Sequence, residues 1–119
     1  MKTVIKQLTE AFGPSGYETE VSELIKTMVE KYADELKTDV MGNLIAIKKG
    51  SQDGRKIMFA AHTDEIGLVV THIDDKGFLR FGNVGGVGIS TLVGNRVRFA
   101  GGAVGAIYQE KGDWKELTL

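Results

Sequence analysis

The feature that most constrains the fold is the apolar run Lys56-Ile-Met-Phe-Ala-Ala61, in which five consecutive residues carry no charge. A strand without alternation between apolar and polar residues is typical of a sheet that is covered on both faces. We therefore expect residues 56–61 to form a central, buried strand, with other elements packed on either side of it.

Two amphipathic helices are predicted before this strand. The first covers residues 2–12 and ends at Gly-Pro-Ser-Gly (13–16), a turn-forming sequence. The second covers residues 18–36, with Ser15 or Thr19 as its cap. Its apolar residues recur at intervals of three and four, as one helix face requires: Val21, Leu24, Ile25, Met28, Val29, Tyr32 and Leu36. Helices followed by strands around an apolar strand favour an α/β sandwich with a mixed sheet.

The second half of the chain consists of short strands and turns. The sequence has 16 glycines and one proline, and most of the glycines follow Asp75. After a strand at 44–48, we expect strands at 68–73, 78–81, 96–100, 103–108 and 114–119, with a hairpin turn at 74–77. Their close spacing predicts a small β-barrel. We place a soft boundary near Val70, which separates residues 1–70 from residues 71–119.

Composition excludes several classes of function. The chain of 119 residues has no cysteine, which excludes disulfides, thiolate metal sites and a cysteine nucleophile. Its net charge of −1 favours neither nucleic acid nor an anionic membrane as a partner. No apolar run approaches the ~20 residues of a membrane span, and the N-terminus does not resemble a signal peptide. We therefore expect a cytoplasmic protein.

His62 and Asp64 are the candidate functional residues. They directly follow the predicted strand, and a strand end in an α/β sheet is a common place for ligands. One imidazole nitrogen of His62 could hold a metal while Asp64 accepts the other N–H and fixes the tautomer. A histidine that is merely hydrogen-bonded in a turn explains the same short pattern equally well. Glu65 is interpreted as a solvated or capping acid, and His72 as an exposed strand residue.

Five motifs in chain order resemble the N-terminal part of the M42 family of metallo-aminopeptidases, the glutamyl-aminopeptidase or TET-like group. They are PSGYE (14–18), D-x-x-GN (39–43), AHTDEIG (61–67), IDDKGF (73–78) and LVGNRV (92–97). Some members of this family were once named endoglucanase or cellulase M. Apart from these names, nothing indicates a carbohydrate-active enzyme. The sequence shows no carboxylate pair flanked by sugar-stacking aromatic residues, and Trp114 is the sole tryptophan.

The resemblance implies a peptidase domain interrupted by an inserted β-rich dimerisation domain, with the insertion beginning near Val69 to Thr71. Residues 1–70 would form the N-terminal part of the peptidase domain, and residues 71–119 the N-terminal part of the inserted domain. It implies two divalent ions, zinc or cobalt, peptide substrates, and homo-oligomers. His62 matches the family's first metal-ligand histidine, and Asp64 matches the catalytic acid that supports it. Thr63 stands where the family commonly has methionine.

The resemblance also implies that the remaining acidic ligands, a glutamate pair containing the general base and a late histidine lie beyond Leu119. We therefore expect the chain to be inactive alone, because one histidine and one aspartate do not complete a roughly four-coordinate zinc site. The alternative is a non-catalytic folding or association module from a truncated or split chain.

Overall fold

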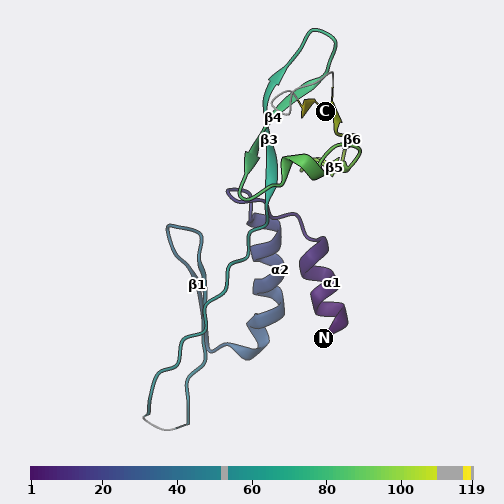
Figure 1. Ribbon diagram of the computed structural model, residues 1–119. Coiled ribbons are helices and arrows are strands. Elements are labelled where there is room, and N and C mark those ends of the chain that lie inside the picture. The colour runs from purple at the N-terminus through teal and green to yellow at the C-terminus, as the bar shows by residue number, and fades with distance from the viewer. Residues whose placement is uncertain (52–53, 110–116, 119) are drawn as a thin grey trace. The chain divides into compact units, whose positions relative to one another are not determined.

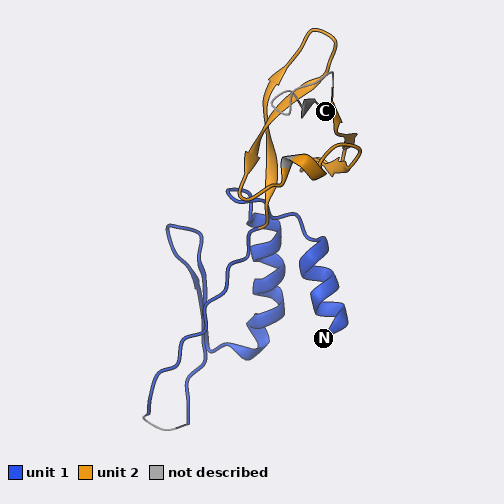
Figure 2. Ribbon diagram, in the orientation of Figure 1, with its two compact units in different colours: residues 1–64 blue, residues 65–119 orange. Residues whose placement is uncertain are grey.

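The computed structural model describes residues 1–119 except 52–53, 110–116 and 119. The chain divides into two compact units, residues 1–64 and residues 65–119 (Figure 2). Among the described residues, no helix is long and apolar enough to span a membrane. The predicted boundary near Val70 lies inside a strand of the second unit, and the assignment of peptidase and inserted domains stays a prediction.

The first unit begins with two helices that contact each other, α1 (Lys2–Glu10) and α2 (Thr19–Val29) (Figure 1). The Gly-Pro-Ser-Gly sequence separates them as predicted. Neither Ser15 nor Thr19 caps α2, because its N-cap is Glu18 and no side chain caps it. The buried apolar contact of α2 is made by Val21, which is 4% exposed.

The second helix ends earlier than its apolar pattern predicts. A 3-10 turn (Glu30–Tyr32) follows α2, and Ala33 is already extended, with φ −93° and ψ 145°. The Asp34 amide then donates to the Ile47 carbonyl at 2.8 Å. Leu36, expected on the helix, instead lies in β1 (Glu35–Thr38) opposite Ala46 of β2 (Leu44–Ile47). Pairing of β1 with β2 has therefore overridden the helical period.

The turn between β1 and β2 has the predicted form. One Asp39 oxygen, Oδ1, accepts hydrogen bonds from the amides of Met41 and Asn43, and Oδ2 accepts one from the Asn43 side chain, each at 2.9 Å. Gly42 has φ +87°, a conformation that residues with a Cβ rarely adopt. The D-x-x-GN motif thus closes an antiparallel hairpin.

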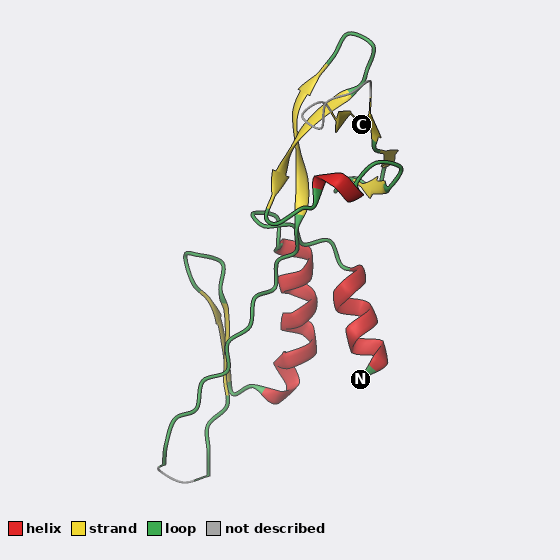
Figure 3. Cartoon of the chain, viewed as in Figure 1, coloured by secondary structure: helices red, strands yellow, loops and turns green. Residues whose placement is uncertain are grey.

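The prediction of a buried strand at 56–61 is wrong for this structure. Among the described residues, none between Gly54 and Asp64 belongs to a strand (Figure 3). Ile57, Met58 and Phe59 are 77%, 88% and 93% exposed. A strand needs a neighbour for its backbone N–H and C=O groups, and in the described first unit the only paired strands are β1 and β2.

The second unit is built of antiparallel strands. β3 (Gly67–Ile73) and β4 (Leu79–Val84) form a long hairpin with an irregularity between Val70 and His72. The turn at 74–77 is present, with Gly77 at φ +85°. The remaining strands are shorter and are β5 (Arg96–Arg98), β6 (Val104–Ala106), β7 (Tyr108–Gln109) and β8 (Leu117–Thr118).

These strands do not close into the predicted barrel. The described residues form a sheet in the order β3-β4-β8-β7 and a separate pair, β5-β6. Every pair of strands, in both units, is antiparallel, so no mixed sheet is present in the described part. Most of the predicted strand 114–119 lies outside the described residues. The α/β class is confirmed, and a dimerisation domain is not evident.

Candidate metal-ligand site

His62 and Asp64 lie on the extended segment that precedes β3. We predicted His62 directly after a buried strand. That strand is absent from this structure, because residues 56–61 are not a strand, and the His62 side chain is 86% exposed. Asp64 is less accessible, with a side chain that is 39% exposed.

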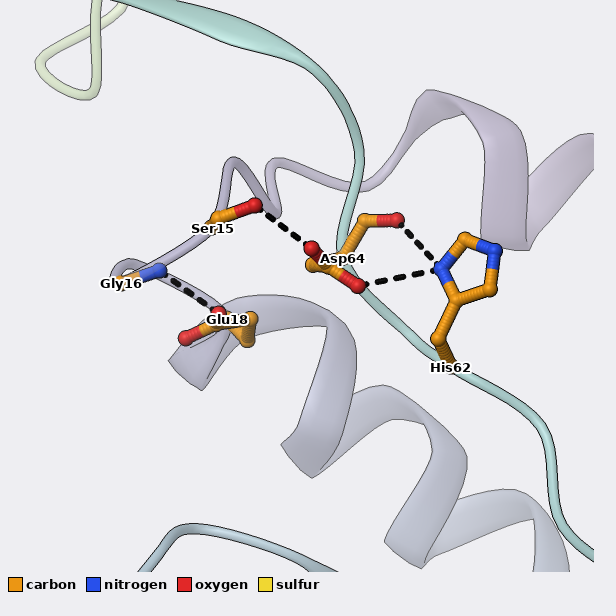
Figure 4. Close-up of polar contacts among 5 residues, drawn as sticks. All are labelled: Ser15, Gly16, Glu18, His62 and Asp64. Atoms are coloured by element: carbon orange, nitrogen blue, oxygen red, sulfur yellow. Dashed lines mark hydrogen bonds and ion pairs between the residues drawn. The ribbon is translucent and has the colours of Figure 1, made fainter. Parts of the chain in front are cut away.

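The predicted contact between the two residues is present (Figure 4). Nδ1 of His62 lies 3.0 Å from the carbonyl oxygen of Asp64 and 3.0 Å from its Oδ1. A carbonyl oxygen only accepts hydrogen bonds, so Nδ1 must carry the hydrogen. In the neutral ring the lone pair is then on Nε2. This is the tautomer that a metal ligand with a supporting carboxylate requires.

Ser15 completes the arrangement and was not predicted to do so. Its hydroxyl donates to Oδ2 of Asp64 at 2.5 Å, so each oxygen of the carboxylate has a partner. The hydrogen bond from Ser15, followed by that from His62, lowers the pKa of Asp64. From the sequence, Ser15 was predicted only as a possible cap of the second helix. The PSGYE motif contains Ser15 and is the sequence feature that could have indicated its contact with Asp64.

The loop that carries Ser15 is held by several local contacts. Gly13 is buried, and a Cβ at this position would lie 2.7 Å from Cγ1 of Val21. The amide of Tyr17 donates to the Pro14 carbonyl at 2.8 Å. The amide of Gly16 donates to the Glu18 carboxylate at 2.6 Å (Figure 4). The Gly-Pro-Ser-Gly sequence therefore forms a compact turn that packs on α2.

The other acidic and histidine candidates are Glu65 and His72. His72 is exposed on β3, as predicted. Glu65 is also exposed. Both belong to the second unit, whereas His62 and Asp64 belong to the first.

The residues present fit one metal ligand rather than a closed metal site. Nε2 of His62 is a suitable donor for zinc or cobalt. No three His, Asp or Glu residues within the described ranges are grouped so that they could hold an ion. The described part of the chain therefore supplies a histidine with its orienting carboxylate and not a complete ligand set.

Comparison with known proteins identifies the family of the chain. A model of the M42 glutamyl aminopeptidase family matches residues 42–111. A protein of Acetivibrio thermocellus is 51% identical over 121 residues, which cover 100% of this chain and 36% of its own. The chain thus spans about a third of the curated relative that it matches over its full length.

Two solved structures are similar to this chain in both sequence and fold. An aminopeptidase from Desulfurococcus kamchatkensis is 40% identical with a TM-score of 0.86, over 98% of this chain and 35% of the other. The TET1 peptidase of Pyrococcus horikoshii, which can assemble into a tetrahedron or a large octahedral shell, is 39% identical with a TM-score of 0.69. That match covers 84% of this chain and 30% of the peptidase.

Proposed function

Because the chain belongs to the M42 glutamyl aminopeptidase family, we propose that it forms the N-terminal part of a two-metal aminopeptidase that removes N-terminal residues from peptides. The observation that carries the proposal is the state of His62. Its Nδ1 donates its hydrogen to Asp64, so the lone pair on Nε2 is available to bind an ion.

Each residue has a distinct role in this proposal. His62 binds one zinc or cobalt ion through Nε2, and Asp64 is the catalytic acid that holds the ring in the required tautomer. When bound, the two ions supply Lewis acidity to the scissile carbonyl and lower the pKa of an attacking water. The remaining ligands and the general base are not supplied by the described residues.

We propose further that the chain is inactive alone. The support is the lack of any three grouped ligands in the described ranges, together with the partial coverage of its relatives. The same observations favour the alternative, a non-catalytic folding or association module. A cytoplasmic location is part of the proposal and is supported by the absence of cysteine.

We also propose that the protein forms homo-oligomers through its second half, residues 71–119. The support is indirect and comes from the assemblies of the Pyrococcus horikoshii TET1 peptidase. Neither nucleic acid nor a membrane surface is part of the proposal, because the formal charge of −1 gives no basic excess.

A chimera tests the catalytic proposal directly. Residues 1–119 would replace the matching 35% of the Desulfurococcus kamchatkensis aminopeptidase, and hydrolysis of aminoacyl-p-nitroanilides would be measured with cobalt or zinc. We expect the chimera to be active. Asp64→Asn should lower its activity by on the order of 10- to 100-fold, the usual effect of losing a partner of a metal ligand. His62→Gln should lower it further.

The second histidine provides the matched control. The chain has two histidines, and His72→Gln in the same chimera should retain activity. The 119-residue chain alone should show no turnover with either metal. Turnover by the purified chain that disappears in His62→Ala would contradict inactivity. Equal activity of the His62→Gln and His72→Gln chimeras would refute the role given to His62.

A further inference from the structure

We propose that Ser15 is a positioning residue that fixes the carboxylate of Asp64 in the rotamer that faces His62. Ser15 touches neither the imidazole nor any reacting atom, so it acts only through Asp64. The inference deepens the site and rests on the proposed function for its purpose, although its test does not depend on activity.

The first step of the argument is the geometry of the carboxylate. Oδ1 of Asp64 accepts from His62 Nδ1 at 3.0 Å, and Oδ2 accepts from the Ser15 hydroxyl at 2.5 Å. The two donors approach different oxygens of one group (Figure 4). Rotation about the Asp64 side-chain bonds would break the Ser15 hydrogen bond together with the one to His62. Ser15 therefore opposes every other staggered rotamer of Asp64.

The second step is that the turn containing Ser15 makes more packing and hydrogen-bond contacts than the segment that carries His62. His62 is 86% exposed and lies on a segment without regular secondary structure. Ser15, by contrast, lies in a turn that packs on Val21 through Gly13. The Pro14–Tyr17 and Gly16–Glu18 hydrogen bonds stabilise the same turn. A contact that spans 49 residues of sequence thus ties the exposed pair to the helical part of the first unit.

The third step separates this role from a simpler one. A hydrogen bond that only fastened residues 60–64 to the loop would stabilise the fold without selecting a rotamer. The positioning role makes a different prediction. Without the hydroxyl, the fold remains and the Asp64 carboxylate is free to leave His62, whose Nδ1 then keeps only the Asp64 carbonyl as its acceptor.

The test is an NMR measurement on the 119-residue chain and its Ser15→Ala and Ser15→Thr variants. Three-bond couplings from the backbone nitrogen and carbonyl carbon to Cγ report the χ1 rotamer of Asp64. Nitrogen shifts of the His62 ring report which ring nitrogen carries the hydrogen. A His72→Gln background removes the other histidine and makes the ring assignment unambiguous. Amide spectra of all variants check that the first unit stays folded.

We expect one dominant Asp64 rotamer in the wild type and in Ser15→Thr, which keeps the hydroxyl. In Ser15→Ala the couplings should average over at least two rotamers, while the Asp64 carbonyl keeps the ring hydrogen on Nδ1. Unchanged couplings in Ser15→Ala would overturn the inference. Averaging in both variants would also overturn it, because the hydroxyl would then not be the cause.

A zinc titration of the same samples separates this inference from the proposed function. If zinc leaves the His62 Nε2 shift of the wild type unchanged, the ligand role of His62 in this chain fails, while the effect of Ser15 on Asp64 stands. If zinc shifts Nε2 but Ser15→Ala leaves Asp64 in one rotamer, the ligand role stands and the inference about Ser15 fails.

Discussion

Gly13 lies against Val21, one of the two buried hydrophobic residues in the described part of the chain. In Gly13→Ala, the new methyl carbon would lie 2.7 Å from Cγ1 and 3.3 Å from Cβ of Val21. A valine side chain is short and stiff, so the turn must move away from α2. Overpacking of this kind costs about 1–3 kcal/mol. We expect a loss of that size in the free energy of unfolding, measured by urea denaturation.

Gly101→Ala is the matched control for this substitution. A Cβ at Gly101 meets no atom within 4 Å, and such surface changes usually stay within about 0.5 kcal/mol. Equal stability of the two variants would show that the turn does not pack on Val21 as described.

At the scale of single residues, the sequence predicted the pair but not its support. His62 and Asp64 are two positions apart, so a local pattern was sufficient to connect them, and their contact is present. Ser15 is 49 positions from Asp64, and no periodicity links such residues. Only the folded turn brings its hydroxyl to the carboxylate. The roles in metal binding and catalysis stay predictions.

At the scale of elements, the β1–β2 hairpin should weaken at low pH. The side-chain hydrogen bond from Asn43, and then the backbone hydrogen bonds, lower the pKa of Asp39 in the folded chain. A lowered folded-state pKa means that the stabilisation is complete above the unfolded value of about 3.9. It is lost as the pH falls through the lower folded value. The protection factor of the Asn43 amide, which corrects the observed exchange rate for the intrinsic effect of pH, should therefore fall on acidification through this range.

Asp39→Asn separates this effect from general acid unfolding. An amide oxygen can still accept the two backbone N–H bonds, but the amide nitrogen cannot accept one from Asn43. The variant should exchange faster than the wild type at neutral pH and should lose this part of the pH dependence. An identical pH profile in both proteins would mean that Asp39 is not the titrating group.

Elements whose contacts are local were predicted well, and elements that depend on distant partners were not. The turns at 39–43 and 74–77 follow from Asp and Gly within a few residues. The run 56–61 has the composition of a central strand, yet it pairs with no strand in the described structure. Composition indicates that a segment is suited to a buried position, but it does not supply the neighbouring strands that would bury it. In this structure Phe59 is 93% exposed.

At the scale of the whole molecule, the chain exposes more surface than its mass predicts. Its accessible surface is 9854 Å². A compact monomer of 12.9 kDa would expose about 6,300 Å², and even two separate units of half that mass about 7,600 Å². The described core contains only Val21 and Ile107 as buried hydrophobic residues. This excess is larger than the ~800 Å² that each partner buries in a standard interface, so the chain has enough exposed surface for one.

The second unit offers specific edges for association. β7 ends the order β3-β4-β8-β7, and β5-β6 is a two-stranded pair. Val104 on β6 is 64% exposed and Tyr108 on β7 is 57% exposed. Ile107, which lies between them in the sequence, is only 2% exposed and belongs to the core of this unit. Exposed apolar edges pair readily with another chain unless charges oppose it.

We therefore predict a homo-oligomer, most simply a dimer, that associates through residues 71–119. Val104→Lys places a charge on the exposed edge and should raise the dissociation constant at least about tenfold, or ~1.4 kcal/mol. Phe59→Lys is the control, because Phe59 is still more exposed but lies in the first unit. Light scattering across a dilution series measures both. A folded monomer at tens of micromolar would contradict the prediction. The prediction would also be contradicted if Phe59→Lys dissociated the oligomer while Val104→Lys left its dissociation constant unchanged. The exposed segment 57–59 would then be the surface that associates.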